Sequence, residues 1–384
     1  MDKQKTNLNI PPPNLLKDPH LSYPSGNIHL AFSDYIHQCQ ALVQSARPQD
    51  STLIINANTP YELYPETPIL TQNKKIKYGV LLVHGLLDSP LSLREIGNNL
   101  QAQGCLVRSV LLPGHGTVPG ALLHVHYHEW INTVWYGMHS LAKEVEQIYI
   151  LGYSTGGTLA ILHALNHPED NIAGIIAIVP ALKIKSVFAP LSGLASKLGR
   201  LWHRAAWAAI MPENDYAKYQ SIAMNGVYQV YQLTQLIKQH SKQLPCPTLA
   251  FLTEDDKTIC TPTAIRFLQQ QKQAHKIILY KKNPHTNSAT LVERPSYYPE
   301  ENIHDFSHVA LPCSPQNKHY GKTGDYYGSK DNENYQYGSY VIPELQYYDF
   351  LYRHQLLRYP RRLLTYNPDF NYLIEQIEHF IIKQ

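Results

Sequence analysis

Short runs of apolar residues alternate with amphipathic stretches along residues 77–178. Each run is too short for a buried helix and ends beside a glycine, proline or histidine, which is typical of a strand covered on both faces. The intervening stretches place apolar side chains at helical spacing. This alternation predicts a mostly parallel sheet flanked by helices, an α/β fold. The expected strands are residues 78–83, 105–112, 147–151 and 172–179.

Helices are expected between these strands. Ser89 and Pro90 fit the N-cap and first turn of one helix, and Gly104 fits its end. Another helix is expected to leave the turn after residues 147–151 and to cover residues 158–165. A further helix is indicated by apolar side chains that fall on one face: Trp130, Val134, Met138, Leu141 and Val145.

The alternation stops after residue 182 and resumes near residue 246. Residues 183–245 contain no convincing strand and repeat apolar side chains at helical spacing. An insertion at this point lies above the carboxyl edge of the sheet, where α/β proteins bind ligands, so we interpret it as a helical cap. Ordinary core helices are the alternative. The apolar positions of residues 183–245 include Leu191, Leu194, Leu198, Leu201, Trp202, Trp207, Val227, Val230 and Tyr231.

The chain therefore divides into four expected parts. Residues 1–75 form an N-terminal extension with a helix over about residues 29–46. Residues 76–182 and 246–384 form the two parts of the sheet domain, on either side of the cap. The second part contains strands at 248–253 and 276–280, a helix capped by Thr261 and Pro262, a tyrosine-rich elaboration, and a final helix marked by Leu373, Ile377, Phe380 and Ile381.

Composition narrows the classes of protein. A hydrophobic content of 43% suits a large core, and 33 basic against 30 acidic residues, without a basic run, disfavour a nucleic-acid partner. No segment has the roughly 18 uninterrupted apolar residues of a membrane span, and the first 20 residues lack the pattern of a secretory signal. Five widely spaced cysteines indicate reduced thiols. We expect a cytoplasmic protein, with export by a signal-independent route left open.

The strongest chemical signal is the turn Gly152-Tyr153-Ser154-Thr155-Gly156. It follows an expected strand and opens an expected helix, the context in which a strained turn exposes a nucleophilic serine. The flanking glycines allow the backbones of strand and helix to approach closely. Ser154 is therefore the predicted nucleophile. A serine hydroxyl needs a base to take its proton and an acid to orient that base.

The acid is expected after a later strand, where Glu254, Asp255 and Asp256 follow one another. Asp256 is preferred because the aliphatic Ile259 three residues later starts the next packed segment. The other two then read as solvated loop charges.

The base should follow the acid in chain order. His308 is preferred, because it lies beside the apolar run 309–311, which could form an added strand. His285 and His304 remain alternatives.

Backbone N–H groups are expected to stabilise the oxyanion. In this context one donor is the residue after the nucleophile, Thr155, and the other lies in the loop after an upstream strand, here Leu86. His84 precedes that loop and is expected to shape it rather than to act as the base.

Two further groups of side chains could carry chemistry. The histidines at 124, 126 and 128 would share one face of a strand, but no cysteine or acidic cluster supports a metal site. Cys260 is expected to be a buried apolar side chain. No metal or cofactor is predicted.

The stretches Leu82-Val83-His84-Gly85-Leu86, Leu112-Pro113-Gly114-His115-Gly116 and Gly152 to Gly157 together resemble the monoacylglycerol-lipase and bacterial carboxylesterase branch of the α/β hydrolases, which overlaps the serine aminopeptidase-like group. The resemblance covers residues 77–182 and 246–282, with His308 as a motif match further on. It implies a capped pocket and hydrolysis of a small or lipid-like carboxylic ester through an acyl-enzyme. The alternatives are a thioesterase, an acyltransferase, an aminopeptidase, or a non-catalytic binding protein of this fold.

Overall fold

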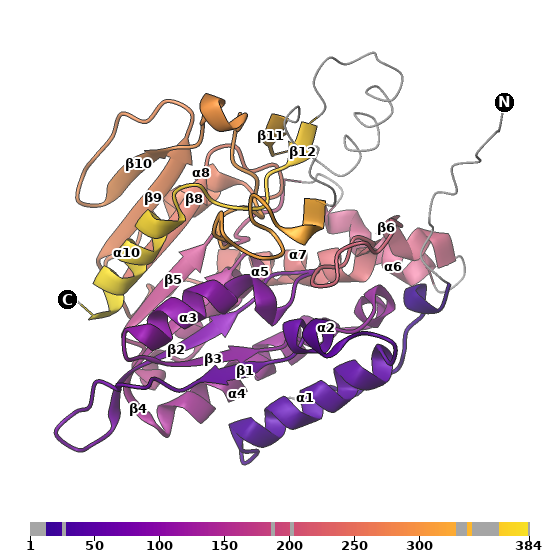
Figure 1. Ribbon diagram of the computed structural model, residues 1–384, viewed down its shortest axis with the longest axis horizontal. Helices are drawn as coiled ribbons and strands as arrows, with labels where there is room; N and C mark the ends of the chain where they lie inside the picture. The colour runs from indigo at the N-terminus through magenta and orange to yellow at the C-terminus, as the bar shows by residue number, and fades with distance from the viewer. Residues whose placement is uncertain are drawn as a thin grey trace.

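Eight strands form one sheet in the computed structural model, in the order β1-β3-β2-β4-β5-β8-β9-β10, and helices flank it (Figure 1). Neighbouring strands are parallel except for β1, which pairs antiparallel with β3. This is the α/β-hydrolase fold, so the predicted fold class is confirmed. The structure describes residues 13–24, 28–185, 189–199, 203–327, 336–339 and 361–382.

The strands of the sheet are β1 (Tyr61–Leu63), β2 (Ile76–Val83), β3 (Leu106–Val110), β4 (Val145–Tyr153), β5 (Gly174–Ile178), β8 (Thr248–Thr253), β9 (His275–Lys281) and β10 (Leu291–Pro295). The helices are α1 (Phe32–Ala46), α2 (Thr52–Ala57), α3 (Arg94–Ala102), α4 (Tyr127–Ala142), α5 (Thr155–Asn166), α6 (Ser192–Leu198), α7 (Met224–Gln239), α8 (Thr261–Gln269) and α10 (Phe370–Ile382). Two small ladders pair β6 (Trp207–Ala209) with β7 (Ile222–Ala223) and β11 (Gln336–Gly338) with β12 (Arg361–Leu363). Short 3-10 turns cover Pro13–Leu16, Pro90–Leu93, Pro119–Leu123, Pro168–Asp170, Ala189–Leu191, His203–Ala206, Pro299–Glu301 and Asp325–Tyr327.

The central strands end together at one edge of the sheet. Val83 of β2 pairs with Gly152 of β4, and Ile178 of β5 pairs with Tyr153 of β4 and with Phe251 of β8. These strands are almost wholly buried because helices flank the sheet, which explains their continuous apolar composition. The loops that follow β2, β4 and β8 therefore meet at one place.

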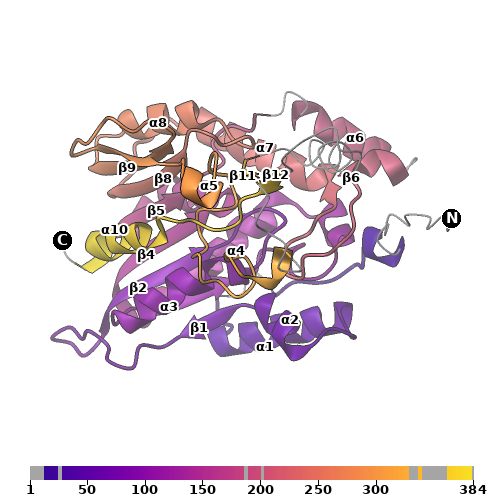
Figure 2. The ribbon, with the colours of Figure 1, turned by 45° about the horizontal axis from the view of Figure 1, so that its top comes forward.

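Where the structure describes the N-terminal segment, over residues 13–24 and 28–75, this part of the chain packs against the sheet and contributes a strand to it. Residues 61–63, expected to lie in an extension, form the edge strand β1, and α1 and α2 lie side by side near it (Figure 2). Tyr35 of α1 is 1% exposed, and its hydroxyl donates to the Leu111 carbonyl (3.2 Å) and accepts the Leu111 N–H (3.0 Å). The segment therefore completes the hydrogen bonds of the chain just after β3.

We expect Tyr35→Phe to lower the free energy of unfolding by about 1–3 kcal/mol, because the buried N–H and C=O of Leu111 would lose their partner. Urea unfolding followed by circular dichroism measures this loss. Tyr64→Phe is the matched control, since Tyr64 is 51% exposed and its hydroxyl contacts the half-buried Glu144. Equal stability of Tyr35→Phe and the wild type would contradict an integral role for α1.

The segment between β5 and β8 contains α6 and α7, as expected (Figure 2). It also contains the short ladder of β6 and β7, where no strand was expected. Strand β6 has three residues and β7 has two, too few for a pattern of alternation. Helix α7 packs against α5, and a Cβ at Gly226 of α7 would lie 3.3 Å from the Leu86 side chain. Leu201 and Trp202 lie outside the described residues. The division of the chain into a cap and a sheet domain remains an interpretation.

Three other expectations were wrong. Val145 starts β4 instead of ending a helix, because α4 stops at Ala142. Residues 309–311 lie in turns, and the added strand is β10, where the partly exposed Glu293 and Arg294 hide the strand pattern at the sheet edge. The N-cap of α8 is Cys260 rather than Thr261, which is the first residue of the helix.

Within the described residues, no helix combines the length and apolar character needed to cross a membrane.

Candidate functional site

Ser154 lies at the tip of the turn between β4 and α5. Its φ of 55° and ψ of −116° are a strained conformation for a residue with a side chain. Its N–H donates to the Ile178 carbonyl at 2.8 Å, which fixes the turn to β5. A Cβ at Gly156 would lie 2.0 Å from the Val83 carbonyl oxygen, so only glycine lets α5 start this close to β2. Ser154 is 8% exposed.

His308 links Ser154 to Asp256. Its Nε2 lies 2.8 Å from Ser154 Oγ, and its Nδ1 lies 2.6 Å from Asp256 Oδ2. An ionised carboxylate can only accept hydrogen bonds, so Nδ1 carries the proton and Nε2 can accept the proton of the serine hydroxyl. His285 is exposed in the β9–β10 loop, and the N–H of His304 donates to the Tyr337 carbonyl. Among the three candidate histidines, the structure joins His308 to Ser154.

Asp256 is fully buried in the loop after β8. Its Oδ1 accepts the N–H groups of Thr258 (2.7 Å) and Ile259 (2.9 Å), which leaves Oδ2 for His308. Burial alone would raise the pKa of Asp256, but His308 and these two N–H groups outweigh burial and hold the pKa below its usual value. The side chain is therefore a carboxylate at neutral pH.

Asp255 has a different place, which the sequence did not reveal. Its Oδ2 accepts the Ser296 hydroxyl (2.6 Å) and the Phe306 N–H (3.4 Å), two residues before His308. Burial raises the pKa of Asp255. Asp255 thus ties the acid loop to the turn that carries His308, whereas Glu254 is exposed, as expected for a solvated loop charge.

The loop after β2 lies directly against the serine turn. A Cβ at Gly85 would lie 3.1 Å from Ser154 Cβ, and Leu86 is the next residue. Thr155 is the first residue of α5, so its N–H has no acceptor within the helix. The two residues expected to stabilise an oxyanion therefore belong to the two segments that border Ser154.

His84 is engaged in this loop through both ring nitrogens. Nδ1 lies 2.8 Å from the Gly85 carbonyl oxygen, and Nε2 accepts the Leu112 N–H at 3.1 Å. Complete burial lowers the pKa of His84 to about 4. These contacts favour the interpretation that His84 shapes the loop.

Protonation of His84 is expected to make stability depend on pH. Between about pH 6.5 and about pH 4 the unfolded chain binds a proton at this histidine and the folded chain does not, so the free energy of unfolding falls as the pH falls. We expect a contribution of up to about 1.4 kcal/mol per pH unit. Urea unfolding from about pH 7 to about pH 4.5 should show a smaller slope in His84→Asn. The exposed control His285→Asn should keep the wild-type slope, and an unchanged slope in His84→Asn would refute the assignment.

Within the described ranges, no three His, Cys, Asp or Glu side chains are placed to hold a metal ion. His126, one of the three histidines of the possible metal site, caps α4 by accepting the His128 N–H. Cys260 is only half-buried, against expectation, and accepts the Thr263 hydroxyl at 3.2 Å.

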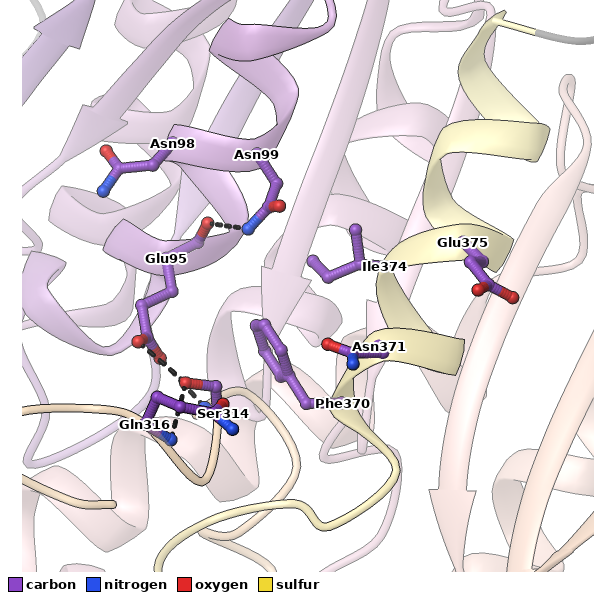
Figure 3. A pocket seen from close by; sticks show the side chains of 9 residues that line it. All are labelled: Glu95, Asn98, Asn99, Ser314, Gln316, Phe370, Asn371, Ile374 and Glu375. Atoms are coloured by element: carbon purple, nitrogen blue, oxygen red, sulfur yellow. Dashed lines mark hydrogen bonds between the residues drawn. The ribbon is translucent and has the colours of Figure 1, made fainter. Parts of the chain in front are cut away.

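A polar cavity of about 520 Å³ lies between α3, the turn at residues 314–316 and α10 (Figure 3). Ser154, Asp256 and His308 do not line it. Ser314 donates to the Glu95 carboxylate through its N–H and its hydroxyl, both at 2.9 Å, and so fixes the turn to α3.

Comparison with known proteins identifies relatives of the central part of the chain. A thermostable monoacylglycerol lipase from Bacillus sp. (strain H-257) is 27% identical over 216 residues, which cover 56% of this chain and 84% of the lipase. Among solved structures, a monoacylglycerol lipase from Paleococcus ferrophilus is 21% identical and covers 57% of this chain and 88% of its own, with a TM-score of 0.45. A structure described under the metagenome-derived lipolytic enzymes LipS and LipT is 18% identical and covers 59% of this chain and 87% of its own, with a TM-score of 0.48.

The family model described as serine aminopeptidase, S33, matches residues 74–287. That match includes Ser154 and Asp256 but ends before His308. It spans more than half of the 384 residues. The chain therefore belongs to the serine aminopeptidase S33 family of α/β hydrolases.

Proposed function

We propose that this protein is a serine hydrolase that cleaves a carboxylic ester through an acyl-enzyme, with Ser154, His308 and Asp256 as its catalytic triad. The observation that carries the proposal is the pair of contacts of His308, 2.8 Å to Ser154 Oγ and 2.6 Å to Asp256 Oδ2. This arrangement serves to activate a hydroxyl, so a binding protein of the same fold has no need of it.

In the first half-reaction, Ser154 Oγ attacks the ester carbonyl carbon while His308 Nε2 takes its proton. Asp256 holds the imidazole in the required tautomer and stabilises its positive charge. The N–H groups of Leu86 and Thr155 are the proposed donors to the oxyanion, and one such donor typically contributes about 2.7–4 kcal/mol. His308 then protonates the departing alcohol, which leaves an acyl group on Ser154.

In the second half-reaction, water attacks the acyl-enzyme. His308 Nε2 takes a proton from this water and returns it to Ser154 Oγ as the acid departs. The base and the nucleophile are each regenerated, so the cycle uses only ester and water.

The proposed substrate is a small or lipid-like ester. The similarity to a monoacylglycerol lipase supports a glycerol ester with one acyl chain. A thioesterase, an acyltransferase or an aminopeptidase would use the same acyl-transfer chemistry. The family description, serine aminopeptidase, makes the aminopeptidase the second candidate.

A substrate panel separates these activities. We expect the purified protein to hydrolyse p-nitrophenyl esters and 1-monoacylglycerols, with kcat/KM depending on acyl length, and to leave aminoacyl p-nitroanilides intact. Ser154→Ala serves as the blank for contaminating esterases. Cleavage of aminoacyl amides in preference to every ester would contradict the ester proposal.

A further inference from the structure

The loop proposed to supply an oxyanion donor contains a strained residue and a buried charge. Leu87 has a φ of 63°, which a leucine rarely adopts without support. The next side chain, Asp88, is 1% exposed, and its Oδ1 accepts the Ser92 hydroxyl at 2.6 Å. A carboxylate buried this deeply needs a cationic partner to remain charged.

That partner is Lys218, from the segment between β6 and β7. Its Nζ lies 3.7 Å from Asp88 Oδ1, and its side chain is 13% exposed. The adjacent Tyr219 N–H donates to the Leu87 carbonyl at 2.8 Å. Burial raises the pKa of Asp88, and Lys218 opposes that rise. Lys218 and Tyr219, which follow one another in the segment between β6 and β7, therefore bind Asp88 and Leu87, which follow one another in the loop.

Lys218 is itself fixed from the other side. Its N–H donates to Asp215 Oδ1 at 3.2 Å, and its ammonium lies 4.1 Å from the centre of the Tyr320 ring. The Tyr320 hydroxyl donates to Asp215 at 2.9 Å, and His319 Nε2 lies 3.0 Å from the same carboxylate. The C-terminal segment around His319 and Tyr320 thus packs behind Lys218.

We propose that Lys218 is a positioning residue, whose ion pair with Asp88 holds the strained loop so that the Leu86 N–H faces the carbonyl oxygen of a substrate bound at Ser154. This inference rests on the proposed function. The oxyanion develops only in the transition state, so a displaced donor should reduce turnover more than substrate binding.

Steady-state kinetics on a p-nitrophenyl ester test this role in Lys218→Met and Asp88→Asn. We expect kcat to fall about tenfold or more in Lys218→Met, while KM changes by less than about threefold. The inhibition constant of a trifluoromethyl ketone, whose hemiketal places an oxyanion at the same site, should rise in parallel with the loss of kcat/KM. Lys322→Met is the matched control, because Lys322 lies in the C-terminal segment with a 58% exposed side chain.

A fluorophosphonate probe keeps the two hypotheses apart. If the wild type neither reacts with the probe nor turns over the ester, the proposed function and this inference both fail. If the wild type is active but both variants keep kcat within about twofold of the wild-type value, or change only in KM, the positioning role alone is overturned. Asp88→Asn preserves the shape of the side chain, so it decides the outcome if Lys218→Met does not fold.

Discussion

Replacing Ser154 with alanine is expected to lower kcat for ester hydrolysis by about four to six orders of magnitude. Without Oγ there is no atom to form the acyl-enzyme, and only the oxyanion donors and the binding of substrate remain. The change removes one buried hydrogen bond, that to His308 Nε2, so the free energy of unfolding should fall by no more than about 1–3 kcal/mol. Comparison of kcat with urea unfolding separates the loss of chemistry from a loss of fold.

Ser140→Ala is the matched control for this variant. It also removes a buried hydroxyl, which donates to the Gly137 carbonyl within α4. We expect its kcat to equal that of the wild type. Esterase activity in Ser154→Ala within about tenfold of the wild type would show that another group, or a contaminant, performs the reaction.

Replacing Asp256 with asparagine is expected to lower kcat by about 10⁴-fold. The asparagine Oδ1 can still accept the N–H groups of Thr258 and Ile259, so its amide nitrogen must face His308 Nδ1. Two donors cannot share a hydrogen bond, so Nδ1 becomes the acceptor and the proton moves to Nε2. Nε2 can then no longer take the proton of Ser154.

Glu254→Gln is the control for the Asp256 variant, since it neutralises an exposed carboxylate in the same loop. We expect its kcat to stay within about twofold of the wild type. Pre-steady-state kinetics should assign the loss in Asp256→Asn to acylation, with KM changed little. A kcat of Asp256→Asn within about tenfold of the wild-type value would contradict the proposed role of Asp256 as the triad acid.

The parts of the site that depend on adjacent residues could be predicted from the sequence. The turn at Ser154 is encoded by the glycines beside it and by the strand and helix that flank it, all within a short stretch. The placement of the Asp256 carboxylate could be predicted in the same way, because it accepts N–H groups two and three residues later; its role as the acid stays a prediction.

The histidine that contacts Ser154 could only be narrowed to three candidates, with His308 preferred over His285 and His304, and its role as the base stays a prediction. The position of His308 beside Ser154 depends on the course of the chain after β9, which includes β10 and the contact of Asp255 with Phe306. No local sequence pattern encodes that course. The pairing of Asp88 with Lys218 was not predicted for the same reason. The two residues are 130 positions apart in the sequence, and only the tertiary structure buries them together. Edge strands β1 and β10 were missed because short or partly polar strands resemble loops.

Labelling by a fluorophosphonate probe tests the central claim most directly, because the probe reacts covalently with an activated serine. Intact-protein mass spectrometry of the wild type should show a single adduct, and peptide mapping should place it on Ser154. Ser154→Ala should show none, and Asp256→Asn should label far more slowly. An unlabelled wild type, or equal labelling of Ser154→Ala, would contradict the account.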